Sequence, residues 1–289
     1  MRRFGLAVPL AGALALGCGS DPATSPAAPT PVTCEEPSYA DPALEPQTIG
    51  KVALFVYDLD EAPVQGAPVT VCGIDVCSNL EHTDDYGKAV VTLSSPLTKP
   101  ALKFGDALEH AELAILLDHD ADSALSFPSL HTPALPVEGS PLGAGKRAES
   151  GGVLLTLAAN ATFTLDNLPP YDTDESRTFR ATELLPDAIP AGLDHGAGLE
   201  RVFTLAPLGA VMCPAATLTL PNSAGWDSGT AVEFLVQGFG VGVEKGDQPY
   251  APYGEWQAVA TGVVDAAGEH LVMTSGGLPV ISNVGVRRL

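Results

Sequence analysis

Positive charge is scarce in this sequence of 289 residues. It holds 14 Lys and Arg against 35 Asp and Glu, which gives a formal net charge of −21 at pH 7. Phosphate backbones repel an acidic chain, so we expect no nucleic acid among its partners. Only 17% of the residues are charged, so the acidity reflects missing Lys and Arg rather than blocks of acids.

Aromatic residues and the signatures of common catalytic sites are also scarce. Aromatic residues make up 6% of the chain, which leaves few side chains to line a sugar-binding cleft. The sequence contains no Gly-Xaa-Ser-Xaa-Gly, no His-Glu-Xaa-Xaa-His and no glycine-rich phosphate loop. His110 and Glu112 are two positions apart and would share one face of a strand, but the sequence shows no third metal ligand beside them. We therefore expect a protein that is not an enzyme and has no cofactor.

The N-terminus carries an export signal. Arg2 and Arg3 precede an apolar run at residues 4–16, which is shorter than the roughly 20 residues that span a bilayer. The run ends in Ala-Leu-Gly before Cys18, which resembles the lipobox of bacterial lipoproteins. This resemblance implies that residues 1–17 are a signal peptide and that Cys18 is acylated, giving stable membrane anchoring. An ordinary signal peptide cut near Gly17 is the alternative.

The resemblance also implies a location. Because Gly19 rather than Asp follows Cys18, the sorting rules of Gram-negative envelopes favour the outer membrane. Residues 18–47 are rich in proline and small polar residues, a composition that cannot bury a core. We expect them to form a disordered tether between the lipid and a folded body.

The rest of the sequence favours an all-β fold. Gly and Pro number 30 and 26, and short alternating apolar runs recur between turn residues. Strands are expected at residues 51–58, 67–72, 88–93, 101–104 and 111–117. Nine more are expected in the second half, at 153–157, 162–165, 178–183, 200–205, 216–220, 231–237, 255–261, 270–274 and 280–286. A stretch rich in Pro, Gly and Ser separates the two groups. We therefore expect two β-sandwich domains in tandem, at 48–130 and 152–289, joined by a linker at 131–151.

Four cysteines remain besides Cys18, and an even number in an exported chain indicates two disulfides. Three pairings are open. We favour Cys72–Cys77, because these two are close in sequence, which leaves Cys34–Cys213 by elimination. Cys72 and Cys77 also stand near His82, Asp84 and Asp85, so a metal site is the competing interpretation.

Residues 63–69, together with Thr83, Asp84, Gly87 and Ala89, carry a resemblance to a known family. The segment Pro-Val-Gln-Gly-Ala-Pro-Val, followed by Thr-Asp-Asp-Tyr-Gly-Lys-Ala, resembles carboxypeptidase-regulatory-like, or transthyretin-like, domains over about 50 residues. The resemblance implies a non-catalytic β-sandwich of about seven strands used as an accessory, adhesive or structural module. It also implies that Asp84 and Asp85 belong to a hairpin turn and are not metal ligands.

A second resemblance covers about 70 residues of the C-terminal half. Its residues are Pro-Ala-Ala-Thr-Leu-Thr-Leu-Pro-Asn at 214–222, Gly229, Trp256, Gly262 and Gly268. They resemble ZU5-like β-domains of bacterial surface proteins. The matched residues are structural, so the resemblance implies packing and no chemistry.

Asp118, Asp120 and Asp122 are the metal candidates of the sequence. They alternate as the first carboxylates of calcium loops do, but Ser123 stands where such loops have Gly, and Ser129 where they have Glu. A solvated acidic loop is the alternative interpretation.

The sequence as a whole predicts a lipid-anchored, non-catalytic protein of the cell envelope that acts as a structural, adhesive or binding module. Its expected partners are the membrane, through the lipid, and an envelope protein or polysaccharide. Two alternatives stay open, namely an envelope hydrolase whose site is assembled from distant loops and a calcium-dependent binding module.

Overall fold

The computed structural model describes residues 38–40, 44–74, 76–117, 123–165, 171–190, 192–239 and 247–289. These residues form strands β1 to β20 and one short 3-10 turn, Pro186–Ala188. They contain no α-helix, so none that is long and apolar enough to cross a membrane. The all-β prediction is confirmed. The chain divides into Met1–Pro31 and Val32–Leu289, and all of the described residues lie in the second unit.

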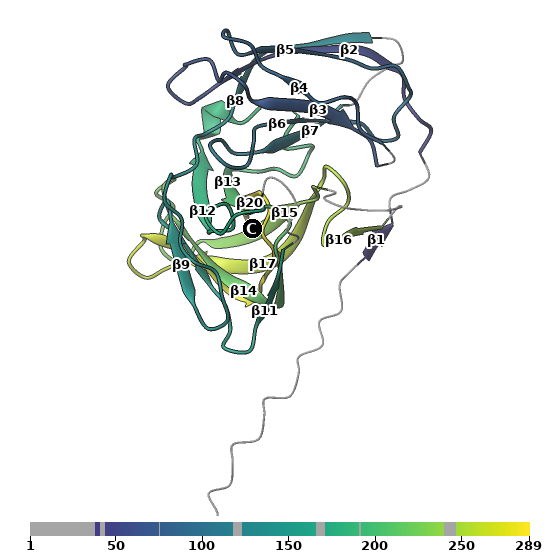
Figure 1. The fold of residues 1–289 in the computed structure, drawn as a ribbon. Helices are drawn as coiled ribbons and strands as arrows, with labels where there is room; N and C mark the ends of the chain where they lie inside the picture. Colours follow the sequence, from purple (N-terminus) through teal and green to yellow (C-terminus); the bar gives the residue numbers. More distant parts are fainter. Residues whose placement is uncertain are drawn as a thin grey trace, which may run out of the picture. The chain divides into compact units, whose positions relative to one another are not determined.

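The first part of the fold is a sandwich of two sheets, here called the N-terminal sandwich (Figure 1). One sheet has the strand order β5-β2-β8, with β2 and β8 parallel, and the other has the order β4-β3-β6-β7. The strands are β2 (Ile49–Tyr57), β3 (Pro68–Cys72), β4 (Glu81–His82), β5 (Lys88–Thr92), β6 (Ala101–Phe104), β7 (Leu113–Leu116) and β8 (Ser123–His131).

Alternation along the strands builds the core of this sandwich. Val52, Leu54 and Val56 of β2 are fully buried, whereas the residues between them are only partly covered. Side chains of a strand point alternately to its two faces, so every second residue faces the opposite sheet. The expected strands at 51–58, 67–72, 88–93 and 101–104 match the observed ones within two residues at either end.

The second part of the fold is one sheet of eleven strands, here called the curled sheet. Its order is β12-β13-β20-β15-β17-β18-β14-β10-β9, and β11 and β19 also pair with β14. The strands are β9 (Arg147–Ser150), β10 (Val153–Thr156), β11 (Thr162–Thr164), β12 (Arg180–Leu184), β13 (Arg201–Ala206), β14 (Val211–Pro221), β15 (Ala231–Gln237), β17 (Trp256–Val264), β18 (His270–Gly276), β19 (Leu278–Val280) and β20 (Val284–Arg288). A separate pair joins β1 (Ser38–Ala40) to β16 (Asp247–Pro249).

The curled sheet bends until its two end strands meet. The amide of Ala181 in β12 donates to Ser150 Oγ in β9 at 3.1 Å, and Ser140 and Phe179 form a backbone bridge nearby. Register shifts in the β15–β17, β17–β18 and β14–β19 pairs supply the bending, since bulges kink strands and increase their twist. We expected a second sandwich of two stacked sheets, whereas here one sheet wraps around its own core.

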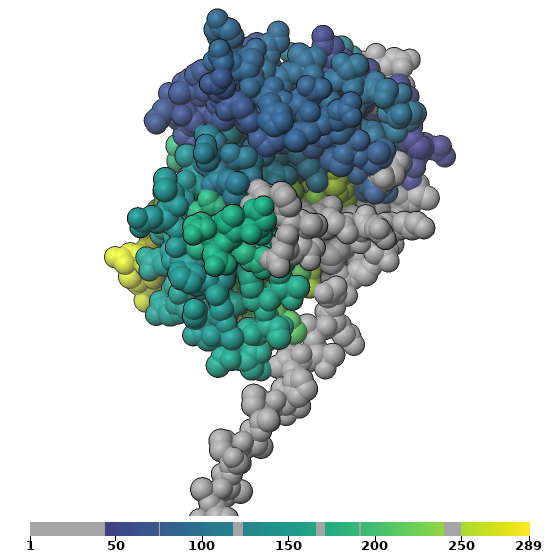
Figure 2. Space-filling model, viewed as in Figure 1, coloured from purple at the N-terminus to yellow at the C-terminus, as the bar shows by residue number. Residues whose placement is uncertain are grey.

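The two parts share buried residues. Leu184, Leu193 and Val202 come from the second half of the chain, yet they belong to the core of the N-terminal sandwich. Strand β9 lies within the segment 131–151 that we expected to be a linker. In the space-filling view the residues of the sandwich lie directly against those that follow them in the sequence (Figure 2). Val32–Leu289 is one compact unit, and the structure does not confirm two separate tandem domains.

Candidate functional site

Several residues that the sequence singles out lie outside the described part of the chain. They are Cys18 and Cys34, and the three acidic residues Asp118, Asp120 and Asp122. Acylation at Cys18 and calcium binding by the three acids therefore stay predictions. Cys213 is disulfide-bonded, and its expected partner is Cys34.

Cys72 and Cys77 form the predicted disulfide. Cys72 is buried at the end of β3 and Cys77 is exposed, and their Cα atoms lie 3.9 Å apart. Thiolates are the form in which cysteines bind metals, so the disulfide removes the two sulfurs from any ligand set. Asp84 Oδ1 accepts the amides of Tyr86 and Lys88, each at 2.9 Å, which makes Asp84 the turn residue that the sequence predicted. The segment is a disulfide-closed loop followed by a capped hairpin turn.

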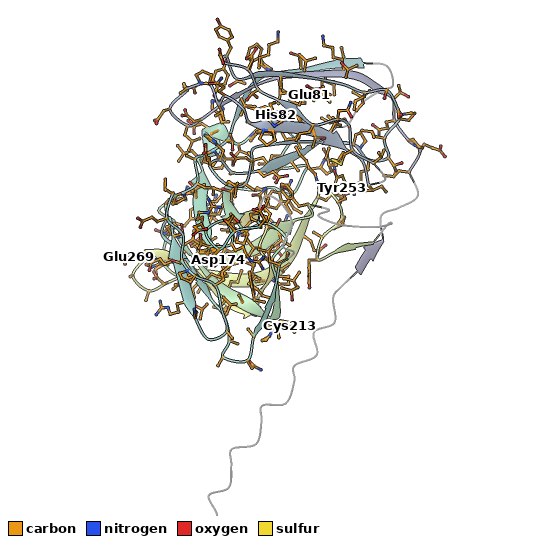
Figure 3. All side chains as sticks on the ribbon, in the orientation of Figure 1. Glu81, His82, Asp174, Cys213, Tyr253 and Glu269 are labelled. Atoms are coloured by element: carbon orange, nitrogen blue, oxygen red, sulfur yellow. A yellow bond between two sulfur atoms is a disulfide. The ribbon has the colours of Figure 1, made fainter. Side chains whose placement is uncertain are left out.

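A buried polar junction connects the N-terminal sandwich to the curled sheet. Gln237 Nε2 donates to Ala114 O in β7 at 2.7 Å, and Asn283 Nδ2 donates to Glu112 O at 3.1 Å. Tyr253 Oη donates to Cys72 O at 3.1 Å (Figure 3). Gln237, Tyr253 and Asn283 are all buried, so water does not compete for these bonds. Sequence reasoning identified none of these residues, because their partners lie more than a hundred positions away.

Two ionisable groups sit in the same junction. Lys103 Nζ donates to Phe239 O at 2.7 Å and lies 5.5 Å and 5.3 Å from the ring centres of Phe239 and Tyr253. Burial lowers the pKa of Lys103, and the negative charge of Glu112 opposes that effect. Burial also raises the pKa of Glu112 to about 7, with Lys103 opposing the increase and Asp106 adding to it. A carboxyl that titrates near neutral pH thus lies between the two halves of the fold.

The turn between β6 and β7 holds one group of potential metal ligands among the described residues. Ligand atoms of Asp106, Glu109 and His110 all lie within 4.8 Å of one another. Imidazole with carboxylates suits zinc or manganese better than calcium. However, Asp106 Oδ1 already accepts the amides of Leu108, Glu109 and His110 at 2.8–2.9 Å. That bonding gives Asp106 a structural role, so we assign the group to the turn. His110 clusters with Asp106 and Glu109, a group that its spacing to Glu112 did not indicate.

Surface hollows lie elsewhere in the described residues, and three of them are well defined. One of about 150 Å³ lies beside Cys77, and one of about 330 Å³ lies on the curled sheet beside Asp265 and His270. A third, of about 490 Å³, lies between β11 and the turn before β12, and it is lined by apolar side chains together with Arg177, Thr178 and two acids. Pockets that bind small molecules have volumes of about 300–1,000 Å³, so the last two are in the relevant range.

Comparison with known proteins assigns no family. No protein-family model matches the chain, and no curated protein matches it either.

Proposed function

We propose that the chain is a lipid-anchored, non-catalytic protein of the bacterial cell envelope whose β-rich body is a structural or binding module. The observation that carries the proposal is the buried junction. Gln237, Tyr253 and Asn283 fix the curled sheet against the backbone of the N-terminal sandwich, so that the loops of both parts are held on one scaffold. Loops placed on a rigid scaffold are a frequent arrangement in binding proteins.

Two further features support this proposal. The Cys72–Cys77 disulfide is consistent with an oxidising compartment outside the cytoplasm. The net charge of −21 disfavours contact with phosphate-rich surfaces and leaves an envelope protein or a polysaccharide as the partner. Calcium-dependent binding through Asp118, Asp120 and Asp122, and hydrolysis at a site assembled from loops, are the alternatives, and no specific contact in the described residues favours either.

Membrane fractionation of single variants tests the anchoring. The wild-type chain, expressed with its signal in a Gram-negative host, should be found with the outer membrane and should incorporate labelled palmitate. Cys18→Ser should lose the label and appear in the soluble periplasmic fraction. The matched variant Gly19→Asp should keep the label but move to the inner membrane. Outer-membrane recovery of Cys18→Ser would exclude the lipid anchor.

A further inference from the structure

The hollow of about 490 Å³ is built from three separate segments between residues 141 and 178. β11 contributes Phe163, the segment before β9 contributes Pro141 and Leu142, and the turn before β12 contributes Asp174 and Glu175. Figure 3 marks Asp174 within the part of the molecule formed by the curled sheet. The Ser140–Phe179 bridge joins two of these segments, so the sheet closure that brings β9 to β12 also forms the hollow.

The floor of the hollow is apolar. Phe163 and Leu142 are partly buried and pack on the core of the curled sheet, while both still line the hollow. Apolar side chains that rest on a packed core have few alternative positions. The hollow therefore offers a preformed apolar surface to a ligand.

The margin of the hollow carries negative charge on a rigid turn. Ser176 Oγ donates to Thr173 O at 2.8 Å, and the amides of Thr173 and Ser176 each donate to the other residue's hydroxyl at 3.2 Å. These bonds hold Asp174 and Glu175, which are both exposed. Among the described side-chain hydrogen bonds and ion pairs, none involves either carboxylate.

The remaining polar groups of the hollow are turned toward the protein. Arg177 donates to Tyr171 O at 3.4 Å and to Leu165 O at 3.0 Å, and Thr178 Oγ1 donates to Glu175 O at 2.7 Å. The guanidinium of Arg177 is therefore committed to the loop before it. Asp174 and Glu175 remain as the charged groups available to a ligand.

We propose that this hollow binds a small organic cation with an apolar body. The apolar part of the ligand lies on Phe163 and Leu142, and its ammonium or guanidinium group lies beside Asp174 and Glu175. This assignment rests on the proposed function, since it names the ligand class of the binding module. The cation lies at the margin and the apolar group on the floor because the carboxylates of Asp174 and Glu175 are exposed, whereas the side chains of Phe163 and Leu142 rest on the core.

A matched set of three probes tests the ligand class. The probes are 4-phenylbutylamine, 4-phenylbutanol and 4-phenylbutyrate, which share one apolar body and carry positive, zero and negative charge. Binding is measured by NMR titration of the full chain carrying Cys18→Ser, so that no acyl chain at this position competes for the hollow. The amine should bind with a Kd on the order of a millimolar, as expected for a ligand of this size. It should bind about five- to tenfold more tightly than the alcohol, since each exposed ion pair adds only a modest gain.

Charge variants then locate the site. The double variant Asp174→Asn with Glu175→Gln should reduce the affinity for the amine to that for the alcohol. The control double variant, Glu138→Gln with Asp227→Asn, changes two exposed acids that do not line the hollow and should bind the amine as the wild type does. Resonances of Phe163 and Leu142 should shift on titration with the amine. All four substituted positions are exposed, so folding should be unaffected.

Three results would overturn the assignment. Equal affinity for the three probes would indicate nonspecific apolar contact. Unchanged binding of the amine by the Asp174 and Glu175 double variant would place the binding site elsewhere. No binding of the amine at a concentration of about 10 mM would show that the hollow does not take this class of ligand. None of these results alters the fractionation of Cys18→Ser, so failure here and failure of the envelope proposal are distinguishable.

Discussion

Replacing Glu112 with glutamine should remove one component of the pH dependence of stability. Burial raises the pKa of Glu112 from its ordinary value of 4.5 to about 7. Between these values the folded chain keeps a proton that the unfolded chain has released. The free energy of unfolding therefore falls as the pH rises through this window and is lowest once Glu112 is ionised in both states. A pKa that moves from 4.5 to about 7 corresponds to about 3 kcal/mol.

Urea unfolding of the wild type and of Glu112→Gln measures this contribution. The difference in unfolding free energy, wild type minus variant, should fall by about 3 kcal/mol between about pH 4.5 and pH 7.5. Glu138→Gln, which removes an exposed carboxyl, controls for the general effect of losing one negative charge. The pKa of about 7 already includes the opposing attraction of Lys103. The expected change in unfolding free energy therefore needs no separate correction for the Lys103–Glu112 pair. A difference between wild type and Glu112→Gln that is independent of pH would refute the argument from burial.

Three other variants test the way the unit is held together. Leu184→Ala leaves a cavity in the shared core and should lower the free energy of unfolding by about 2–5 kcal/mol. The two parts of this variant should still unfold in one calorimetric transition, and two separate transitions would contradict a shared core. Tyr253→Phe removes the hydroxyl that donates to Cys72 O and should cost about 1 kcal/mol in urea unfolding. Cys72→Ser with Cys77→Ser opens a short loop and should cost roughly 2 kcal/mol in the same assay, whereas an unchanged midpoint would mean that the disulfide adds nothing.

Strands with clear alternation could be predicted from the sequence alone. The predicted run at 231–237 matches β15, because Val232, Phe234 and Val236 point to one buried face. The prediction of a single strand at 280–286 is wrong, because β19 ends at Val280 and β20 begins at Val284. There Ser282 Oγ donates to Gln237 O at 2.6 Å and Asn283 Nδ2 donates to Gln237 Oε1 at 3.0 Å, so both side chains serve the junction, while the Gln237 amide donates to Asn283 O at 3.0 Å. The sequence did not predict β4, because a strand of two residues is too short to show an alternation of apolar and polar side chains.

The sites were less accessible to sequence reasoning than the strands. The Cys72–Cys77 disulfide follows from local spacing and the turn at Asp84 from the family resemblance, and both were predicted. The sequence does indicate a turn at Asp106, because an acid there starts a short polar loop between two apolar strands. The three amide hydrogen bonds that Asp106 accepts, however, are visible only in the folded structure. The hollow and the junction combine segments whose proximity depends on how the sheet closes, and no local pattern encodes that closure.

The polar bonds of the junction also explain why one arrangement of the two parts is selected. Apolar packing alone is nondirectional, so it would tolerate small rotations of the sandwich over the curled sheet. Gln237 and Asn283 instead reach particular carbonyls, those of Ala114 and Glu112, from buried positions. A displacement by one residue would leave these donors unpaired, at a cost of about 1–3 kcal/mol for each. The shared core thus stabilises the association of the two parts, while the buried amides fix its geometry.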